Sequence, residues 1–595
     1  MPSDKADLGK IYPDLADKYL SINGQEILSH NPDRHKQHGF HFKADNCIGC
    51  HACETACAEK NGTPAHLSYR HVGYVEGGTY PDFVRVNISM ACNHCEDPVC
   101  LKGCPTLAYT KYVEYGAVLQ DPNICFGCGY CTWVCPYNAP VLDPVKGEVQ
   151  KCNMCIDRLE DGKQPACVSA CLSNALDFSV IDSLPQGKQQ AKLEIHGFPD
   201  PAITRPNIRF EQERSLPAQM TRSDNDPFIY EKDPSGHRYK VKPIAPTQEK
   251  EWGLNQLHSR EDSLVQFTLL YQMVLGAFLT IFFLGIFLPF SDEPNKNPIF
   301  SLLETHPMII ILTYLVLLGL QFFGMFSSTM HLGKPQYFYR ATNNLRHSWV
   351  SREILTTGGF FGFMVGSLGV LYVPFIEWVA PFDAFLAPIF VFGAVAMGPL
   401  GLYCMYRCYR IPARPFWNHW HTGGVFTASA LILGPLLIGF IFGITAFLHG
   451  EETVRLFSYL AWPLFTGTLL QEVSLVSHLD YLKKKGEEAA VSRMLMLNRF
   501  GKTYIARYVS LAILMIGSLL FAFEYIADAW GVFLWGIFFL QAIVHEVIGR
   551  AIFYVAVVPT TIPGAFFWGN KSFEKHARES GLAKMPQVGV VPVRH

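Results

Sequence analysis

The sequence predicts a multidomain protein in which an α+β domain is followed by an all-α membrane bundle of eight transmembrane helices. Three observations lead to this prediction. The chain has 595 residues, which is too long for a single domain. Sixteen of its eighteen cysteines lie between residues 47 and 171, and from about residue 264 the chain is a succession of apolar stretches. Because the composition changes abruptly, the two parts need separate explanations.

The sixteen cysteines form four groups of four. The groups read Cys47-x2-Cys50-x2-Cys53-x3-Cys57, Cys92-x2-Cys95-x4-Cys100-x3-Cys104, Cys125-x2-Cys128-x2-Cys131-x3-Cys135, and Cys152-x2-Cys155-x11-Cys167-x3-Cys171. Each is a variant of the bacterial ferredoxin run, in which three thiolates hold one cubane and the fourth reaches a second. We therefore predict a polyferredoxin domain with four 4Fe-4S clusters and all sixteen cysteines as metal ligands.

Structural zinc and a disulfide framework are the alternatives for such cysteines. Zinc sites also use C-x2-C pairs, but they do not normally occur as sixteen thiolates in interlocked quartets with Cys-Pro ends. Disulfides are disfavoured because we find no cleavable signal sequence at the start of the chain. The two remaining cysteines, Cys404 and Cys408, lie in the apolar part, and we expect them to be bystanders.

The second part of the chain predicts a membrane domain. Its eight apolar stretches are residues 264–289, 307–328, 356–378, 384–406, 423–448, 456–477, 508–527 and 532–557. Each is close to the roughly 20 residues that a helix needs to cross a bilayer. Eight such stretches with short polar connections leave little room for a soluble fold.

The remaining segments are polar. We expect an extension at 1–40, the cysteine-rich domain at 41–220, a linker at 221–263, the membrane anchor at 264–558 and a cytoplasmic tail at 559–595. Part of the polar segment 181–263 is expected to wrap the cysteine-rich domain as an arm. The formal net charge of -2, without a basic tract interleaved with aromatics, excludes a nucleic-acid partner. Four histidines near the start of the chain lack ligand partners and receive no role: His30, His35, His38 and His41.

Basic residues in the short loops predict the orientation in the inner membrane. The loops after the second, fourth and sixth stretches carry fourteen of them, whereas the loops on the other side carry only Lys296 and Arg455. The fourteen are Lys334, Arg340, Arg346, Arg352, Arg407, Arg410, Arg414, Lys483, Lys484, Lys485, Arg493, Arg499, Lys502 and Arg507. Because cytoplasmic loops carry the excess of Lys and Arg, we expect both termini and the cysteine-rich domain to be cytoplasmic.

The residues also resemble those of a known family. The cysteine-rich domain, about residues 47–220, resembles the four-cluster electron-transfer subunit of complex iron-sulfur molybdoenzymes. Residues 264–558 resemble the eight-helix anchor of the dimethyl sulfoxide reductase type. The stretches that carry the second resemblance are His331-Leu-Gly-Lys-Pro335, Asn343, Ser348, Ser351, Glu353, Glu546-Val-Ile-Gly-Arg550, Phe553 and Tyr554. In most such complexes these are two chains, and here they are fused.

This resemblance implies cluster pairing and partners. The fourth cysteines would cross over, so that Cys171 completes the first group, Cys135 the second, Cys104 the third and Cys57 the fourth. A separate, larger molybdopterin-containing catalytic subunit would be the partner. The chain would then relay electrons between that subunit and a membrane quinone or quinol, either menaquinone or ubiquinone, without turning over a substrate alone.

The resemblance and the chemistry of quinones together suggest a quinone site. His331 closes the second apolar stretch and Glu353 precedes the third, on the side expected for the cysteine-rich domain. Such titratable groups at the membrane interface can exchange the two protons of a quinone. The alternative is that Ser351 is an N-cap, that Glu353 favours the helix dipole and that His331 is an interfacial histidine.

Residues inside the predicted spans give weaker support. Glu546 and Arg550 have the i,i+4 spacing of an intrahelical ion pair and could serve the quinone site or neutralise each other. Glu472 and Glu524 are weaker candidates. Haem would need facing histidines from two spans, and only His545 lies well inside one, so we expect no haem.

Three functions remain open. The first is the electron-transfer and anchor subunit of a dimethyl sulfoxide reductase-like complex, with a cytoplasmic sulfite:quinone oxidoreductase as the alternative for the substrate. The second is a ferredoxin-quinone oxidoreductase without a molybdenum partner. The third is a transporter with a regulatory cluster domain, which the absence of paired broken spans disfavours.

Overall fold

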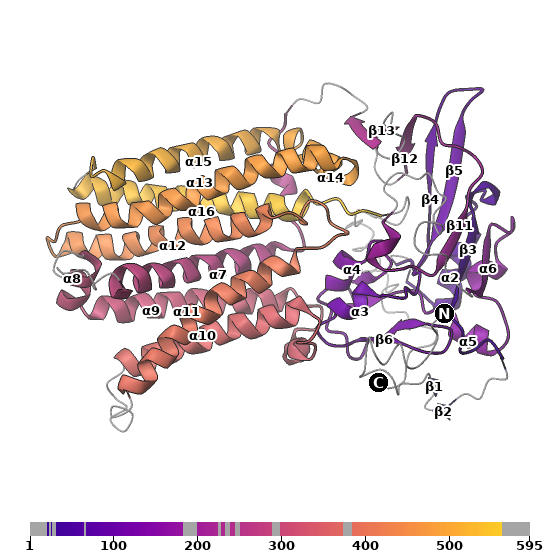
Figure 1. Cartoon of the computed structure of the whole chain (residues 1–595), viewed down its shortest axis with the longest axis horizontal. Coiled ribbons are helices and arrows are strands. Elements are labelled where there is room, and N and C mark those ends of the chain that lie inside the picture. The colour runs from indigo at the N-terminus through magenta and orange to yellow at the C-terminus, as the bar shows by residue number, and fades with distance from the viewer. Residues whose placement is uncertain are drawn as a thin grey trace.

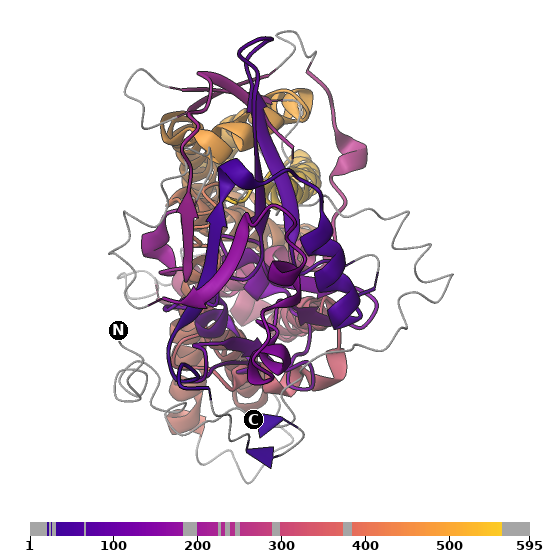
Figure 2. The same cartoon turned by 90° about the vertical axis from the view of Figure 1, so that its right-hand side faces the viewer.

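The cysteine-rich part and the apolar part form two bodies that pack end to end (Figure 1). The computed structural model describes residues 21–22, 25–26, 31–64, 67–181, 199–223, 228–232, 239–243, 250–287, 298–372, 383–526 and 528–561. A β-rich domain occupies one end, and a bundle of long helices occupies the other. Figure 2, seen from the side of the cysteine-rich domain, shows this domain lying over the ends of the helices.

Short strands build the cysteine-rich domain. They are β1 (Ser21–Ile22), β2 (Gln25–Glu26), β3 (His38–Lys43), β4 (His71–Gly77), β5 (Val84–Met90), β6 (Tyr109–Lys111), β7 (Val118–Gln120), β8 (Val141–Asp143), β9 (Glu148–Gln150), β10 (Leu176–Val180), β11 (Ile208–Glu211), β12 (Gln219–Arg222), β13 (Phe228–Lys232) and β14 (Tyr239–Pro243). One sheet has the order β10-β3-β11, and Phe40 and Phe42 of β3 fill the core beneath it because alternate residues face one side. The hairpins β6-β7 and β8-β9 follow the second and third cysteine groups.

Short helices begin within or next to the cysteine groups. They are α2 (Ala52–Asn61), α3 (Val99–Gly103), α4 (Tyr130–Val134), α5 (Ile156–Glu160) and α6 (Ala166–Ser169). Cys57 lies in α2, and Cys104 and Cys135 directly follow α3 and α4. In each of these three groups a short helix therefore connects the third cysteine to the fourth.

The expected boundaries of this domain need correction. Strand β3 begins at His38, and Arg34 forms an ion pair with Glu160 at 2.9 Å, so the domain starts before residue 41. His38 is buried beside Phe178 and does not lie in a solvated segment. The expected linker 221–263 contributes β13 and β14 to a five-stranded sheet of order β14-β13-β12-β4-β5. The arm is thus a sheet extension whose charged and turn-rich composition hid its alternating pattern.

The bundle consists of long helices and two short ones. They are α7 (Asp262–Thr280, continued by the π-helix Ile281–Phe287), α8 (Pro298–Thr305), α9 (Met308–Met330), α10 (Trp349–Tyr372), α11 (Asp383–Cys408), α12 (His421–Leu448), α13 (Val454–Lys485), α14 (Glu487–Leu497), α15 (Gly501–Ala522) and α16 (Asp528–Val555). Helices α7 and α12 cross closely, since a Cβ on Gly434 would lie 2.2 Å from the carbonyl carbon of Gly276. Small residues permit such close packing in membrane helices.

Seven helices in the described part of the chain are long and apolar enough to cross a membrane. The remaining expected stretch, the sixth at 456–477, lies in α13, which is not among the seven because polar residues such as Gln471 and Glu472 interrupt it. Helices α10 and α15 begin at Trp349 and Gly501, seven residues before the expected stretches. Both helices extend beyond the expected apolar stretches because a helix satisfies its own backbone hydrogen bonds, whichever side chains it carries at the membrane interface. The expected tail beyond residue 561 lies outside the described residues.

Basic side chains of the bundle hold the cysteine-rich domain in place. Arg260 donates to the carbonyl of Gly127 at 3.2 Å, Arg340 to that of Asn123 at 2.6 Å and Arg414 to that of Thr132 at 3.0 Å. Lys334 forms an ion pair with Glu148 at 2.6 Å. The domain therefore rests on the end of the bundle that carries the basic loops (Figure 1).

Candidate functional site

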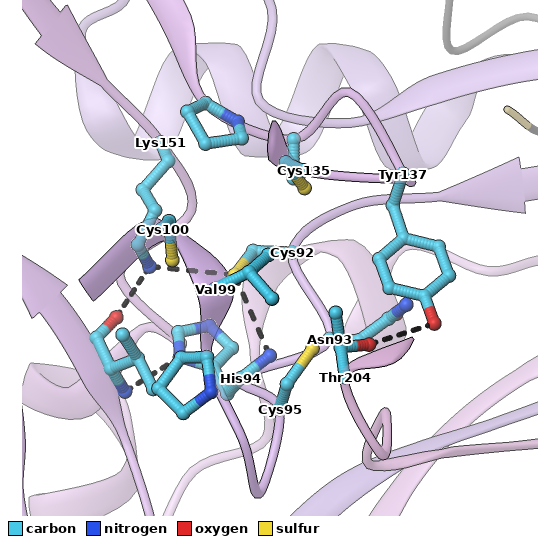
Figure 3. A pocket seen from close by; sticks show the side chains of 14 residues that line it. Cys92, Asn93, His94, Cys95, Val99, Cys100, Cys135, Tyr137, Lys151 and Thr204 are labelled. Carbon is cyan, nitrogen blue, oxygen red and sulfur yellow. Dashed lines mark hydrogen bonds between the residues drawn. The ribbon is translucent and has the colours of Figure 1, made fainter. Parts of the chain in front are cut away.

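The second cysteine group meets the last cysteine of the third. Cys92, Cys95, Cys100 and Cys135 line one cavity together, and Figure 3 shows their sulfur atoms arranged around it. The hairpin β6-β7 and helix α4 lie between Cys104 and Cys135 in the sequence, and the fold returns Cys135 to this cavity. The structure thus brings together the four cysteines for which the resemblance implied a shared cluster.

In the other three groups, the electrostatics likewise place the fourth cysteine of another group close by. Burial, and after it the charge of the Cys104 thiolate, raises the pKa of Cys128 to about 12, and both effects also raise the pKa values of Cys125 and Cys131. Burial and then Cys57 raise the pKa of Cys152. Burial raises the pKa of Cys47 to about 11, with smaller contributions from Cys53 and Cys171.

The C-x2-C loops share one backbone conformation. The residue two positions after the first cysteine has a positive φ in each group, which is Gly49, His94, Gly127 or Met154. In the last three groups the backbone N–H of this residue donates to the sulfur of the first cysteine, at 3.4 to 3.5 Å. Hydrogen bonds to the sulfurs stabilise the thiolate form and tune cluster potentials.

The cavity at the second group fits an iron-sulfur cluster. His94 lines it and accepts a hydrogen bond from the N–H of Val118 at Nδ1, so its proton sits on Nε2. This Nε2 is buried and has no partner in the described part of the chain. Lys151 donates to the sulfur of Cys92 at 3.4 Å. Buried thiolates, a cation and a free N–H donor are what an anionic cluster requires.

A second cavity lies where the two halves of the chain meet. It has a volume of about 350 Å³. The cysteine-rich domain contributes Cys128 and Tyr130 to its lining, and the bundle contributes His331, Glu353 and Cys408. The two residues that we predicted for a quinone site therefore line one cavity together with a cysteine of the third group.

His331 occupies the cavity edge at the end of α9. Its Nε2 lies 3.3 Å from the carbonyl of Cys128, which can only accept, so Nε2 carries the proton. Its Nδ1 lies 3.5 Å from Oε2 of Glu261. Burial, and secondly the charge of Arg260, lowers the pKa of His331 to about 4, and burial raises the pKa of Glu261. The imidazole is therefore neutral and can accept a proton only at Nδ1.

Glu353 points into the cavity from the first turns of α10. The thiol of Cys408 donates to its Oε2 at 3.2 Å, so Cys408 is not the bystander that we expected. Nor is Ser351 an N-cap: its hydroxyl donates to the carbonyl of Ala341 at 2.6 Å. Ser348 takes the capping position and accepts from the N–H of Ser351 at 3.4 Å.

Glu546 and Arg550 lie outside the lining of this cavity. They do not form the ion pair that their spacing suggested. The hydroxyl of Ser429 links them, donating to Glu546 at 2.8 Å and accepting from Arg550 at 3.3 Å. Arg550 also donates to Gln272 at 2.8 Å. Side chains of other helices come between the two charges, which spacing along one helix cannot reveal.

Sequence reasoning missed several buried groups. Tyr409 lines the cavity, and its hydroxyl lies 2.5 Å from that of Tyr554 on α16. His421 and His478 are buried in α12 and α13, with ring centroids 3.6 Å apart. His421 is the first residue of α12, and His478 directly follows the apolar stretch of α13, so neither lies as deep in a predicted span as His545. The only feature of the sequence that could have pointed to Cys408 and Tyr409 is their position beside the basic loop.

Family models match both halves of the chain. A model described as a 4Fe-4S dicluster domain matches residues 84–181. A model described as the DMSO reductase anchor subunit (DmsC) matches residues 256–555.

Curated relatives match the cysteine-rich half. The iron-sulfur subunit of anaerobic dimethyl sulfoxide reductase from Haemophilus influenzae is 37% identical over 182 residues, which are 29% of this chain and 88% of the relative. The corresponding protein of Escherichia coli (strain K12) is 38% identical over 180 residues, 29% of this chain and 87% of the relative. One of the sulfite dehydrogenase subunits of Allochromatium vinosum is 39% identical over 156 residues, 23% of this chain and 65% of the relative.

Proposed function

Because the chain belongs to the DMSO reductase family in both halves, as a fusion of the iron-sulfur subunit with a DmsC-type anchor, we propose that it relays electrons between a separate catalytic subunit and membrane quinone. The partner would be a large molybdopterin-containing subunit, as in the complexes that the chain resembles. Such a chain needs a relay of redox groups and a place where quinone meets the last of them.

The sixteen cysteines would hold four 4Fe-4S clusters, with each fourth cysteine crossing to a partner group. The cavity of Cys92, Cys95, Cys100 and Cys135 supports this most directly. Iron-sulfur clusters supply one-electron steps when bound. In this chain the cysteines, the N–H donors of the C-x2-C loops and the buried cations would hold them and exclude water.

The cavity between the two halves carries the quinone proposal. Its volume of about 350 Å³ lies within the range of small-molecule sites. Cys128 at one wall would place the cluster of the third group beside the ligand, while His331 and Glu353 at another wall present proton-exchanging groups. The cluster that transfers electrons and the groups that exchange protons would then both lie beside the quinone.

His331 and Glu353 would each exchange one of the two protons of the quinone. Quinone and quinol interconvert with two electrons and two protons in either direction. Nδ1 of His331, which lies 3.5 Å from Glu261, carries the lone pair of the imidazole, and Glu353 offers a carboxyl group whose only described partner is the Cys408 thiol. Each would accept a hydrogen bond and then a proton from one quinol hydroxyl, and in the reverse direction its protonated form would give that proton to one quinone oxygen. The apolar walls, among them Phe267 and Ile354, would hold the ring.

The membrane arrangement follows from the bundle. We propose that α13 crosses as an eighth span, because it packs along α12 and α15 and covers the expected stretch. With eight spans, the start of the first span and the end of the last lie on the same side of the membrane as the cysteine-rich domain. Eleven of the fourteen basic loop residues are not needed to hold that domain through Lys334, Arg340 and Arg414, so the charge bias still supports a cytoplasmic location.

The orientation also bears on the substrate of the complex. Two of the relatives belong to dimethyl sulfoxide reductases, which favours that substrate class. A cytoplasmic domain and the likeness to a sulfite dehydrogenase subunit favour sulfite oxidation as the second candidate. Purification of the tagged chain in mild detergent should yield a stoichiometric partner of molybdoenzyme size. Its absence would favour a ferredoxin-quinone oxidoreductase.

Replacement of Glu353 and His331 tests the quinone site. In the purified complex, Glu353→Gln or His331→Ala should lower quinone-dependent turnover by about 100-fold or more, the usual contribution of one acid-base group. Iron content and activity with a dye that reacts at the partner should stay unchanged. Glu472→Gln is the matched control, because Glu472 lies in α13 outside the cavity lining. Normal quinone turnover in both cavity variants would refute the site.

A further inference from the structure

Lys151 connects two of the cysteine groups. It directly precedes Cys152, the first cysteine of the fourth group, and its ammonium donates to the sulfur of Cys92, the first cysteine of the second group, at 3.4 Å. Figure 3 shows the bond from Lys151 to Cys92, and the same nitrogen donates to the carbonyls of Val118 and, at 3.0 Å, of Cys152. One residue thus bridges ligands that would belong to two different clusters.

The geometry shows that Lys151 carries its charge. A neutral amine has two N–H donors and one lone pair, so it could not donate to three acceptors. Here a sulfur and two carbonyl oxygens all face the nitrogen, which requires three N–H groups. The ammonium is therefore a fixed positive charge inside the domain.

This charge has no carboxylate partner. Lys151 is buried, and in the described part of the chain no carboxylate oxygen lies within 4.0 Å of its nitrogen. A buried cation is costly unless an opposite charge compensates it. The negative groups around it are the thiolates of Cys92, Cys100 and Cys152. The compensation for Lys151 must therefore come from the two cysteine groups and whatever they bind.

We propose that Lys151 is a positioning residue whose positive charge raises the reduction potentials of the clusters of the second and fourth groups together. This inference rests on the proposed function, since it requires both clusters. A nearby positive charge stabilises the reduced form, which carries one more negative charge than the oxidised form. Because both clusters feel the same ammonium, it raises both potentials in the same direction.

The redox step itself is a simple exchange. When one of these clusters passes an electron to the other, the first is oxidised by one electron and the second is reduced by one. Lys151 exchanges neither an electron nor a proton. Because both potentials rise together, Lys151 makes both clusters easier to reduce and changes the driving force between them less than it changes either potential.

Three substitutions separate charge from hydrogen bonding. Lys151→Gln removes the charge and keeps N–H donors, Lys151→Met removes both, and Lys151→Arg keeps the charge. Lys111 supplies the matched control: it is also buried, and it donates at 3.0 Å to the carbonyls of Cys95 and Glu96, near the second group alone. Lys111→Met should therefore lower only the potential of the second cluster.

Redox titration of the anaerobically purified full-length chain, followed by paramagnetic resonance, measures the four potentials. Signals are assigned with Cys135→Ser and Cys57→Ser, which alter the second and fourth clusters. In Lys151→Gln and Lys151→Met the reduction equilibrium of both clusters should fall at least tenfold, equal to about 59 mV for one electron. In Lys151→Arg, both clusters should stay close to their wild-type reduction potentials.

Several outcomes would overturn the inference. Unchanged potentials in the neutral variants would show that the charge does not act, and a shift of the second cluster alone would reduce Lys151 to a local contact of Cys92. Failure of Lys151→Gln to bind its clusters would also overturn it, because a tuning charge is not required for assembly. By contrast, wild-type chain holding fewer than four clusters would refute the proposed function itself.

Discussion

Backbone contacts between the two halves depend on three glycines, Gly127, Gly147 and Gly333, which we call the glycine seam. The N–H of Gly333 donates to the carbonyl of Gly127 at 3.3 Å, and the N–H of Lys334 donates to that of Phe126 at 3.0 Å. A Cβ on Gly333 would lie 2.2 Å from the carbonyl oxygen of Gly147 and 2.4 Å from its Cα. Gly333→Ala should therefore force the seam apart.

The expected size of this effect follows from the contact distances. Overpacking a filled interior costs about 1–3 kcal/mol, and the loops opposite cannot yield easily because Gly127 and Gly147 both have positive φ values. An energy of about 1–3 kcal/mol corresponds to a change of about 5–150-fold in an equilibrium constant. We expect the equilibrium between the docked and undocked seam to fall by that factor.

Hydrogen exchange measures this equilibrium directly. The amides of Gly333 and Lys334 should exchange about 5–150-fold faster in Gly333→Ala, since they exchange when the seam opens. Quinone-dependent turnover should fall with it, whereas iron content and dye activity should not. Gly319→Ala is the control, because a Cβ at this position of α9 has no atom within 4 Å. Unchanged protection and turnover in Gly333→Ala would refute the assigned role of the seam.

Three further predictions concern the clusters, the orientation and the contact between the arm and the bundle. Cys104→Ser should change the paramagnetic signal of the third group's cluster and spare that of the second, and the reverse would refute the crossover. A reporter inserted at Gly486, directly after α13, should stay cytoplasmic, and one at Gly450, between α12 and α13, should be exported; export at Gly486 would reverse the orientation. Arg222→Met should destabilise the chain by about 3–5 kcal/mol, measured by denaturant-induced bleaching of the clusters, because it removes the guanidinium that lies 2.9 Å from the buried carboxylate of Glu488. Adding Glu488→Leu should restore most of the loss, and failure of the double variant to recover would contradict this electrostatic explanation.

The cysteine groups show how far the sequence could lead. Their spacing predicts which thiols share a loop, since C-x2-C fixes local geometry, and the resemblance supplied the crossover that brings Cys135 to Cys92. The fixed charge of Lys151 was not visible, although it adjoins Cys152. Its ammonium acts across space on Cys92, which lies 59 residues away, and only the fold brings the two together.

The cavity between the halves was predictable only in part. His331 and Glu353 stand out because they are polar at the ends of apolar stretches. Their neighbours Glu261 and Cys408 come from other helices, and no periodicity along one helix identifies what faces it across a bundle. The same limit explains Glu546 and Arg550, whose spacing suggested a pair that Ser429 instead bridges.

The join between the two halves bears on how the complex assembles. Strand β14 ends at Pro243 and α7 begins at Asp262, and within this segment the backbone of Glu251 bonds to Asn498 and Lys502 at the start of α15. A short tether gives its two ends an effective concentration of about 1 mM, so a contact with a dissociation constant of about 10 µM would be closed about 99% of the time. The backbone contacts of the glycine seam can therefore be weaker than the contacts that two separate subunits would need to stay together. One cluster domain is made for each anchor, and a cell that synthesises this chain never has to match the supply of two.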